Sequence, residues 1–398
     1  MKILDNIPRI AKPSVARFKD YLFREEPVII TDLYRSQPIE RLATSEAAAA
    51  AIGGMPLQVG LNPYGSHRYR RDSIYLTRFD TTLGEFLDRM KKIPDLPFRC
   101  VEFPTPATFR SLFKLPDLAD INRYDPPVSK IYVANRGQST SMHFDGDHRH
   151  VLFTQVFGRK RIALIPPRYS KRLFPYGDLT TMAVHNFPEE EKHRFFRFND
   201  ARECTLHPGE TLLMPKLWWH YIEHIDVTMS FNVRFAQTPY DKRLSYLPIE
   251  YHLQNIAPRL VDPRTVTLRH ERVYRRLLYT YFGKHATPYR RFLSYETALK
   301  ESYAEVCPDA LQGEFVGDFY SKERADLVSL AKRWKGIYCL RLDMEAIPLT
   351  PDSLKTAAAL QKIPLEALRR FLKSLKMSSD LRRLSEVDLR MLLNINLG

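Results

Sequence analysis

The sequence predicts an α+β fold in which a small β-barrel occupies the middle of the chain. Two apolar runs rich in β-branched and aromatic residues, 151–157 and 162–165, have the composition of buried strands. Residues 229–235 alternate strictly between apolar and polar side chains, which is the pattern of a strand with two different faces. After residue 235 the spacing of apolar residues becomes helical. These three patterns place the β-structure in the middle of the chain, before a helical region.

The chain has 398 residues, enough for two to three structural units. We expect residues 1–125 to form an N-terminal α/β segment that packs on the barrel. Residues 126–238 are expected to form the barrel, and residues 239–398 a C-terminal helical bundle.

The N-terminal segment contains one clear strand signal and two helix signals. Residues 27–30 predict a short strand. An alanine-rich helix is expected to begin at Ser45 and to end at Gly53, because a capping residue precedes the alanines and glycine follows them. A second helix is expected over residues 83–92.

Local patterns also order the strands of the barrel. A short basic stretch with one glycine separates the two apolar runs, so we expect them to pair as a hairpin. Pro208 and Gly209 predict a turn that leads into a short strand over 211–214. In residues 229–235, Ser230, Asn232 and Arg234 share the polar face, and in a small barrel that face can point inward.

Residues 166–207 predict a long excursion between two barrel strands. Excursions of this length in a compact domain are often functional loops or lids. The alternative is a solvated loop that does not contact substrate.

The C-terminal region carries helical patterns with basic faces. Residues 266–281 interleave apolar and aromatic positions with Arg269, Arg272, Arg275 and Arg276. Such interleaving is compatible with an RNA-binding surface, and equally with a packing helix that exposes a basic face. Leucines at helical spacing over 365–375 predict another amphipathic helix. These helices are candidates for a homodimer contact.

His143-Phe144-Asp145, together with His220 far downstream, suggests a metal site. Residues i and i+2 of a strand project to the same face, so His143 and Asp145 can bind one ion. His220 completes the set only if the sheet curls into a barrel. Two imidazoles and one carboxylate are the ligand set of mononuclear non-haem iron(II) sites with open coordination positions. Asp147 is an alternative carboxylate by composition, without the i, i+2 spacing.

From about residue 130 to 235 the chain resembles the JmjC/cupin-8 family of Fe(II)- and 2-oxoglutarate-dependent oxygenases, which includes protein asparaginyl hydroxylases and tRNA wybutosine hydroxylases. The matching pieces occur in the family's order. They are Thr140-x-x-His143-x-Asp145, Gln155-Val-x-Gly158-x-Lys160-Arg161, Pro208-Gly209-Glu210, Pro215-x-x-Trp218-Trp219-His220 and the strand that carries Asn232. The resemblance implies a double-stranded β-helix, or jelly roll.

The resemblance also implies residue roles. His143, Asp145 and His220 would hold Fe(II), and O2 would be the oxidant. Lys160 would pair with the distal carboxylate of 2-oxoglutarate, helped by the Thr140 hydroxyl. Asn232 would lie near the carboxylate that chelates the metal. Arg234 is an alternative anchor, because it lies on the inward face of the last strand; no tyrosine is assigned to the family's usual carboxylate-binding place.

Composition limits the remaining possibilities. The formal net charge of +15 predicts attraction to an acidic partner, such as nucleic acid or an acidic peptide. Four widely spaced cysteines do not form a C-x-x-C pair, which favours a reducing compartment. Without a membrane-length apolar run or signal-peptide pattern, the expected location is cytoplasmic, with no membrane partner.

The function that these observations predict is hydroxylation of a protein or peptide side chain. A tRNA nucleoside is the second candidate substrate, because of the charge and the arginine-rich helix, and a small natural product is the third. Histone demethylation is disfavoured, because the chain lacks a zinc-binding cysteine cluster. A catalytically silent barrel that acts as a binding module is the alternative from a different class.

Overall fold

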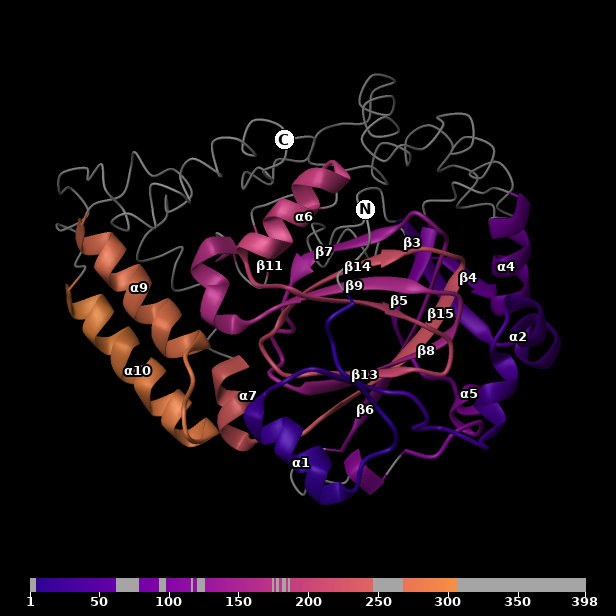
Figure 1. The fold of residues 1–398 in the computed structure, drawn as a ribbon, viewed down its shortest axis with the longest axis horizontal. Coiled ribbons are helices and arrows are strands. Elements are labelled where there is room, and N and C mark those ends of the chain that lie inside the picture. The colour runs from indigo at the N-terminus through magenta and orange to yellow at the C-terminus, as the bar shows by residue number, and fades with distance from the viewer. Residues whose placement is uncertain are drawn as a thin grey trace.

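The structure is a computed structural model, drawn in Figure 1, and the residues that it describes fall into several ranges. They are 5–61, 79–92, 98–115, 117–119, 126–173, 175–176, 179–180, 184, 187–245 and 268–305. The helix predicted over 365–375 and much of the predicted C-terminal bundle lie outside these residues.

The centre of the molecule is a double-stranded β-helix made of two facing layers. One layer has the strand order β13-β8-β15-β6 and the other β7-β14-β9-β12. All neighbours within these layers pair antiparallel. The strands are β6 (Val128–Ala134), β7 (Ser139–His143), β8 (His150–Phe157), β9 (Lys160–Ile165), β12 (Arg202–Leu206), β13 (Thr211–Met214), β14 (Trp219–His224) and β15 (Thr228–Phe235). The predicted fold class, an α+β protein with a jelly-roll core, is confirmed.

The predicted hairpin between the two apolar runs is wrong, although both strands exist. β8 pairs with β13 and β15, whereas β9 pairs with β12 and β14, so the chain crosses from one layer to the other between them. Gly158 makes this crossing, with a φ of 69°. A Cβ atom there would lie 2.1 Å from the Val227 carbonyl oxygen, so the backbones approach too closely for any other residue.

N-terminal strands extend the layer that contains β13 and β6. At one edge lie β1 (Arg9–Ile10) and β2 (Val28–Ile30), and at the other lie β5 (Phe98–Pro104), β3 (Pro56–Leu61) and β4 (Phe79–Thr82). The strand predicted at 27–30 is therefore confirmed as β2. Because β5 pairs with β6, hydrogen bonds cross the boundary predicted near residue 125, and the division into three units stays a prediction.

Helices cover the outer face of this layer. They are α1 (Val15–Arg24), α2 (Ser45–Ile52), α4 (Leu83–Lys92) and the short α5 (Ala107–Arg110). The two predicted helices are confirmed as α2 and α4. The N-cap of α2 is Thr44 rather than Ser45, since its hydroxyl accepts a hydrogen bond from the Ala47 amide at 3.1 Å.

The alternation in β15 separates two environments, as predicted. Met229, Phe231, Val233 and Phe235 lie in the core between the sheet and the N-terminal helices. Asn232 and Arg234 point into the barrel and line its pocket. A separate apolar cluster, with Phe153 and Leu164 among its members, fills the closed part of the barrel interior. The polar face of this strand therefore belongs to the pocket.

The region predicted as an excursion, 166–207, contains a barrel strand. It includes the 3-10 turn Pro167–Leu173, the short strands β10 (Pro175–Tyr176) and β11 (Leu179–Thr180), the helix α6 (Glu189–Phe198), and β12. β12 pairs with β9 over its whole length. The long-loop interpretation is therefore corrected: α6 covers the second layer, and β12 completes it.

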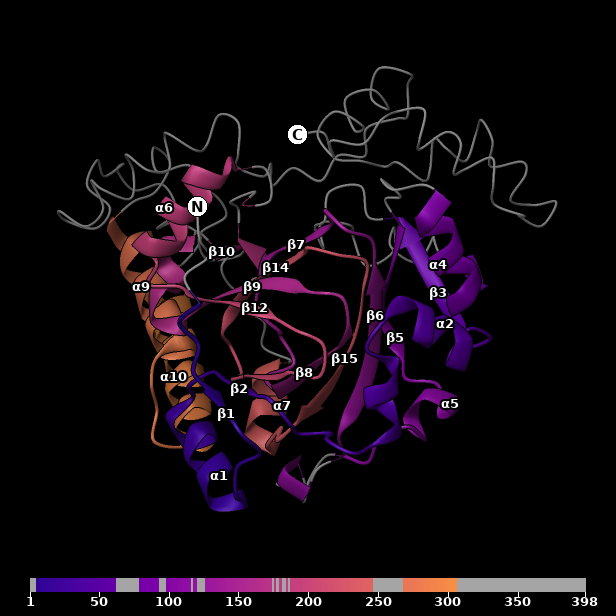
Figure 2. The same cartoon turned by 45° about the vertical axis from the view of Figure 1, so that its right-hand side comes forward.

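On the opposite flank from α2 and α4 lie α9 (Leu268–Phe282) and α10 (Pro288–Glu305), as Figures 1 and 2 both show. With α7 (Pro239–Ser245) they pack on the second layer, and Val273, Leu277 and Tyr281 enter its core. Arg272 and Arg276 pair with Glu305 of α10 at 3.1 and 2.7 Å. Among the described residues, no helix combines the length and the hydropathy that a membrane span needs.

Candidate metal centre

His143 and His220 lie directly opposite each other on neighbouring strands. They are register partners in the antiparallel pair β7–β14, and their ring centroids are 4.0 Å apart. Both side chains are buried. Strand pairing therefore brings together two imidazoles that are distant in the sequence, which is the geometry that the predicted metal site requires.

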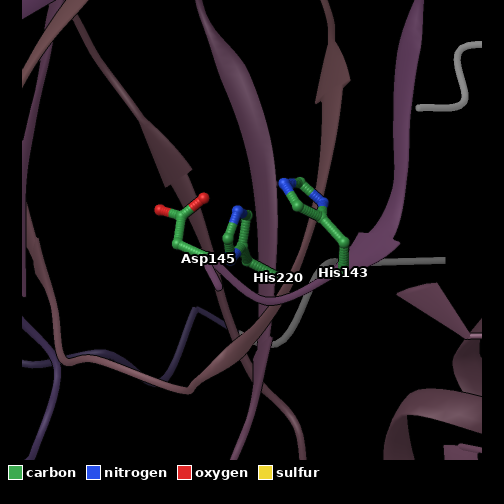
Figure 3. Close-up of side chains that lie close together, drawn as sticks. All are labelled: His143, Asp145 and His220. Atoms are coloured by element: carbon green, nitrogen blue, oxygen red, sulfur yellow. The ribbon is translucent and has the colours of Figure 1, made fainter. Parts of the chain in front are cut away.

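Asp145 completes the group from the loop that follows β7. One ligand atom from each of His143, Asp145 and His220 lies within 4.8 Å of the others. Figure 3 shows the three side chains around one common space. We expected His143 and Asp145 to lie on one strand, because of their i, i+2 spacing. Strand β7 ends at His143, however, so Asp145 lies in the loop that follows. Its convergence with the histidines depends on how this loop is held.

Hydrogen bonds orient the side chains of His220 and Asp145. His220 Nδ1 lies 3.2 Å from the Trp218 carbonyl oxygen. A proton on Nδ1 donates to that oxygen, which leaves the Nε2 lone pair for a metal ion. Burial lowers the pKa of His220, which favours the neutral, metal-binding form. Asp145 Oδ1 accepts a hydrogen bond from Arg234 Nη2 at 3.2 Å.

Asp147, the alternative ligand, faces a different set of partners. Its carboxylate accepts hydrogen bonds from Arg234 Nη1 at 3.1 Å and from Arg149 Nη1 at 3.3 Å. It is not a member of the metal-binding group. The geometry therefore favours Asp145 as the carboxylate ligand.

A pocket extends from this group into the barrel, and Lys160 lies at its inner end. The Lys160 side chain is buried, and its Nζ donates to Ser230 Oγ at 2.5 Å and lies 4.7 Å from the centre of the Phe153 ring. Among the described residues no carboxylate pairs with it. Burial and the neighbouring positive charge of Arg99 hold the pKa of Lys160 well below its ordinary value. An ammonium group in these surroundings is stabilised by an anionic ligand.

The other residues predicted to bind the co-substrate line the same pocket. Thr140 lies on β7 between Lys160 and the metal group, and Asn232 lies on β15. Asn232 Nδ2 donates to the hydroxyl oxygen of Tyr132 at 2.9 Å. The pocket therefore combines a buried cation, a hydroxyl and an amide, which are donors suited to carboxylate groups.

Tyr132 is a pocket residue that the sequence analysis did not assign. It lies on β6, opposite Ser230 of β15. Strand β6 precedes the strand that carries His143, and the sequence analysis assigned no tyrosine there to the binding of a carboxylate. The available signal was alternation in β6, which puts Lys130 and Tyr132 on one face and Ile131 and Val133 in the core.

Arg234, the alternative anchor, lies at the metal end of the pocket instead of the inner end. Its guanidinium donates to Glu102 Oε1 at 2.6 Å, as well as to Asp145 and Asp147. Glu102 has a left-handed backbone, with φ of 53°, at a bulge between β5 and β6. Arg234 is thus engaged by three carboxylates beside the metal group, which favours Lys160 as the partner of a distal carboxylate.

The class that this fold and site define is a double-stranded β-helix protein in which a His-Asp-His group that could hold a metal ion lies beside a pocket lined by buried basic side chains. The cupin-like domain family matches residues 14–241, more than half of the chain. The chain therefore belongs to this family, and the predicted family resemblance is confirmed.

Individual relatives extend the comparison over different lengths. HSPB1-associated protein 1 of Rattus norvegicus is 36% identical over 111 residues, which cover 26% of this chain and 23% of that protein. Jumonji C domain-containing protein 5 of Drosophila melanogaster is 24% identical over 58% of this chain and 59% of its own length. Lysine-specific demethylase JMJ30 of Arabidopsis thaliana is 25% identical over 54% and 51%. The chain thus spans from about a quarter to three-fifths of these relatives.

Proposed function

We propose that this protein is an Fe(II)- and 2-oxoglutarate-dependent oxygenase that hydroxylates a protein or peptide side chain. The observation that carries the proposal is one pocket with His143, Asp145 and His220 at one end and Lys160 at the other. Two neutral imidazoles and a carboxylate suit iron(II) and leave open positions. A buried ammonium suits a dicarboxylate that chelates the metal through its opposite end.

When bound, iron supplies the redox chemistry: 2-oxoglutarate and O2 become succinate and CO2 as one oxygen atom enters a C–H bond of the substrate. The residues of this chain bind and orient. Lys160 and Thr140 would hold the distal carboxylate, and Asn232 would lie near the carboxylate that chelates the metal. The pocket walls would limit the access of water to the reacting centre.

A protein side chain is favoured as the substrate for two reasons. Two of the relatives, from Arabidopsis thaliana and Xenopus tropicalis, are named lysine-specific demethylases, so their names refer to a side chain of a protein. In addition, Arg272 and Arg276 are engaged by Glu305, and such pairing reduces the basic surface of α9 that an RNA would bind. A tRNA nucleoside is therefore the second candidate, and a small molecule the third.

The experiment presents the Fe(II)-loaded protein with a peptide library, with total tRNA and with 2-oxoglutarate, and analyses the products by mass spectrometry. Gain of one oxygen atom on a peptide supports the proposal. Loss of a methyl group identifies a demethylase, and oxygen gain on a nucleoside identifies a tRNA hydroxylase. Absence of succinate with every substrate, in protein that retains iron, supports the alternative of a silent binding module.

A further inference from the structure

A second basic side chain lies at the inner end of the pocket. Arg99, on β5, is only 7% exposed and lines the same pocket as Lys160. Its Nη1 donates to the Thr140 hydroxyl oxygen at 3.0 Å and to the Ser139 carbonyl oxygen at 3.2 Å. Arg99 therefore donates a hydrogen bond directly to the hydroxyl that is predicted to contact the co-substrate carboxylate.

The positive charge of Arg99 acts on Lys160. Burial first, and then the positive charge of Arg99, lower the pKa of Lys160. The pKa of His224, another pocket residue, is lowered by burial, by Lys160 and by Arg99. The repulsion between two buried cations falls when a carboxylate lies between them. The inner end of the pocket is thus electrostatically matched to a carboxylate group.

We propose that Arg99 is a second carboxylate-binding residue, so that Lys160, Arg99 and the Thr140 hydroxyl hold the distal carboxylate of a dicarboxylate co-substrate together. The inference rests on the proposed function and assigns a further residue to the same site. A guanidinium presents planar, paired N–H donors that match the two oxygens of a carboxylate. Two cations at this end also select against 2-oxo acids that have a methyl group in place of the distal carboxylate.

The test measures binding and does not depend on turnover. The protein is loaded with Mn(II), and calorimetry gives its affinities for 2-oxoglutarate and for 2-oxopentanoate, which has the same chain length and lacks the distal carboxylate. Arg99→Gln is expected to bind 2-oxoglutarate about ten- to a hundredfold more weakly, because a charge-assisted hydrogen bond is lost. Its affinity for 2-oxopentanoate should change little. Lys160→Ala should show the same selectivity.

Two further variants complete the design. Arg159→Gln removes a positive charge from an exposed pair with Asp226 and should bind both ligands like the wild type. Arg99→Lys keeps the charge without the planar donor pair, and its 2-oxoglutarate affinity should fall between those of the wild type and Arg99→Gln; it replaces Arg99→Gln if that variant does not fold.

The outcomes separate this inference from the proposed function. One outcome is that the folded Arg99 variant binds 2-oxoglutarate like the wild type, whereas Lys160→Ala binds it more weakly. This outcome overturns the role of Arg99 and leaves the proposed function intact. Equal losses for both ligands overturn it as well, because they indicate a structural role. If the wild-type protein with Mn(II) does not bind 2-oxoglutarate, the proposed function itself fails.

Discussion

The hydroxyl oxygen of Tyr281 lies 2.6 Å from Nε2 of His148, three residues after Asp145. Tyr281, on α9, also packs edge-on against Phe144, the residue before Asp145. The backbone of His148 is left-handed, with φ of 55°, and its side chain is fully buried. Helix α9 thus contacts the loop on both sides of Asp145.

Removing the Tyr281 hydroxyl should therefore weaken metal binding. Tyr281→Phe keeps the ring that packs on Phe144 and removes one buried hydrogen bond. We expect the Mn(II) dissociation constant to rise about two- to tenfold. Tyr279→Phe is the matched control, because that ring lies on the same helix and is 79% exposed. Unchanged metal affinity in Tyr281→Phe would show that the hydrogen bond between Tyr281 and His148 does not help to position the loop.

Lys160 and Arg234 should have separable effects on co-substrate use. Lys160→Ala is expected to raise the 2-oxoglutarate KM by about tenfold or more, because it removes a charge-assisted contact. Arg234→Ala removes a partner of Asp145, so its larger effect should be on the iron concentration needed for half-maximal succinate formation. A larger rise in the 2-oxoglutarate KM for Arg234→Ala than for Lys160→Ala would contradict this assignment. It would indicate that Arg234, and not Lys160, binds the distal carboxylate.

Gly158 should be intolerant of a side chain. Gly158→Ala combines a left-handed backbone with a Cβ that would meet Val227, and we expect it to lower the free energy of unfolding by about 2 kcal/mol or more. Gly137 also has a left-handed φ, of 76°, but has open space around the position of a Cβ. Gly137→Ala therefore measures the backbone strain alone. Urea unfolding measures the free energy of unfolding of both variants. Equal decreases in Gly158→Ala and Gly137→Ala would contradict the close approach between Gly158 and Val227.

The buried histidines predict acid sensitivity. Burial lowers the pKa of both His148 and His150 from 6.5 to about 3. Between these values the unfolded chain binds more protons than the folded chain, so their contribution is complete above about pH 6.5 and decreases as the pH falls. Each histidine can account for about 1.4 kcal/mol per pH unit in that window.

Urea unfolding between about pH 7.5 and pH 5.5 measures this slope. His150→Gln should reduce the pH dependence, whatever its effect on the stability at neutral pH. A wild-type stability that does not change over this range, or that rises in acid, would show that these histidines are protonated in the folded protein.

Local sequence patterns predicted the strands better than their partners. The composition of 151–157 and the alternation of 229–235 identified β8 and β15, because both signals depend only on which faces are buried. Neither signal says which strand lies alongside. In the jelly roll β8 pairs with β13 and β15, both distant in the sequence, so a hairpin inferred from proximity was wrong.

The basic run Arg159-Lys160-Arg161 shows how much of the site a local pattern can predict. The run resembles a solvated turn, yet its three side chains face different surroundings. Arg159 is exposed and pairs with Asp226, whereas Lys160 enters the pocket and Arg161 is buried against Glu203 on the other face of β9. Lys160 lines the pocket, as the family motif led us to expect, and its contact with a carboxylate stays a prediction. Tyr132 and Arg99 were missed because their positions depend on pairing with distant strands.

The most direct test of the central claim is succinate formation from 2-oxoglutarate under limiting iron, compared between the wild-type protein, Asp145→Ala and Asp147→Ala. We expect the wild type to form succinate and Asp145→Ala to form none above background, with a folded far-ultraviolet spectrum. Asp147→Ala should retain a large part of the activity, because its carboxylate contacts Arg234 and Arg149 and is not part of the metal-binding group. Wild-type succinate formation by Asp145→Ala would contradict the assignment of the metal centre.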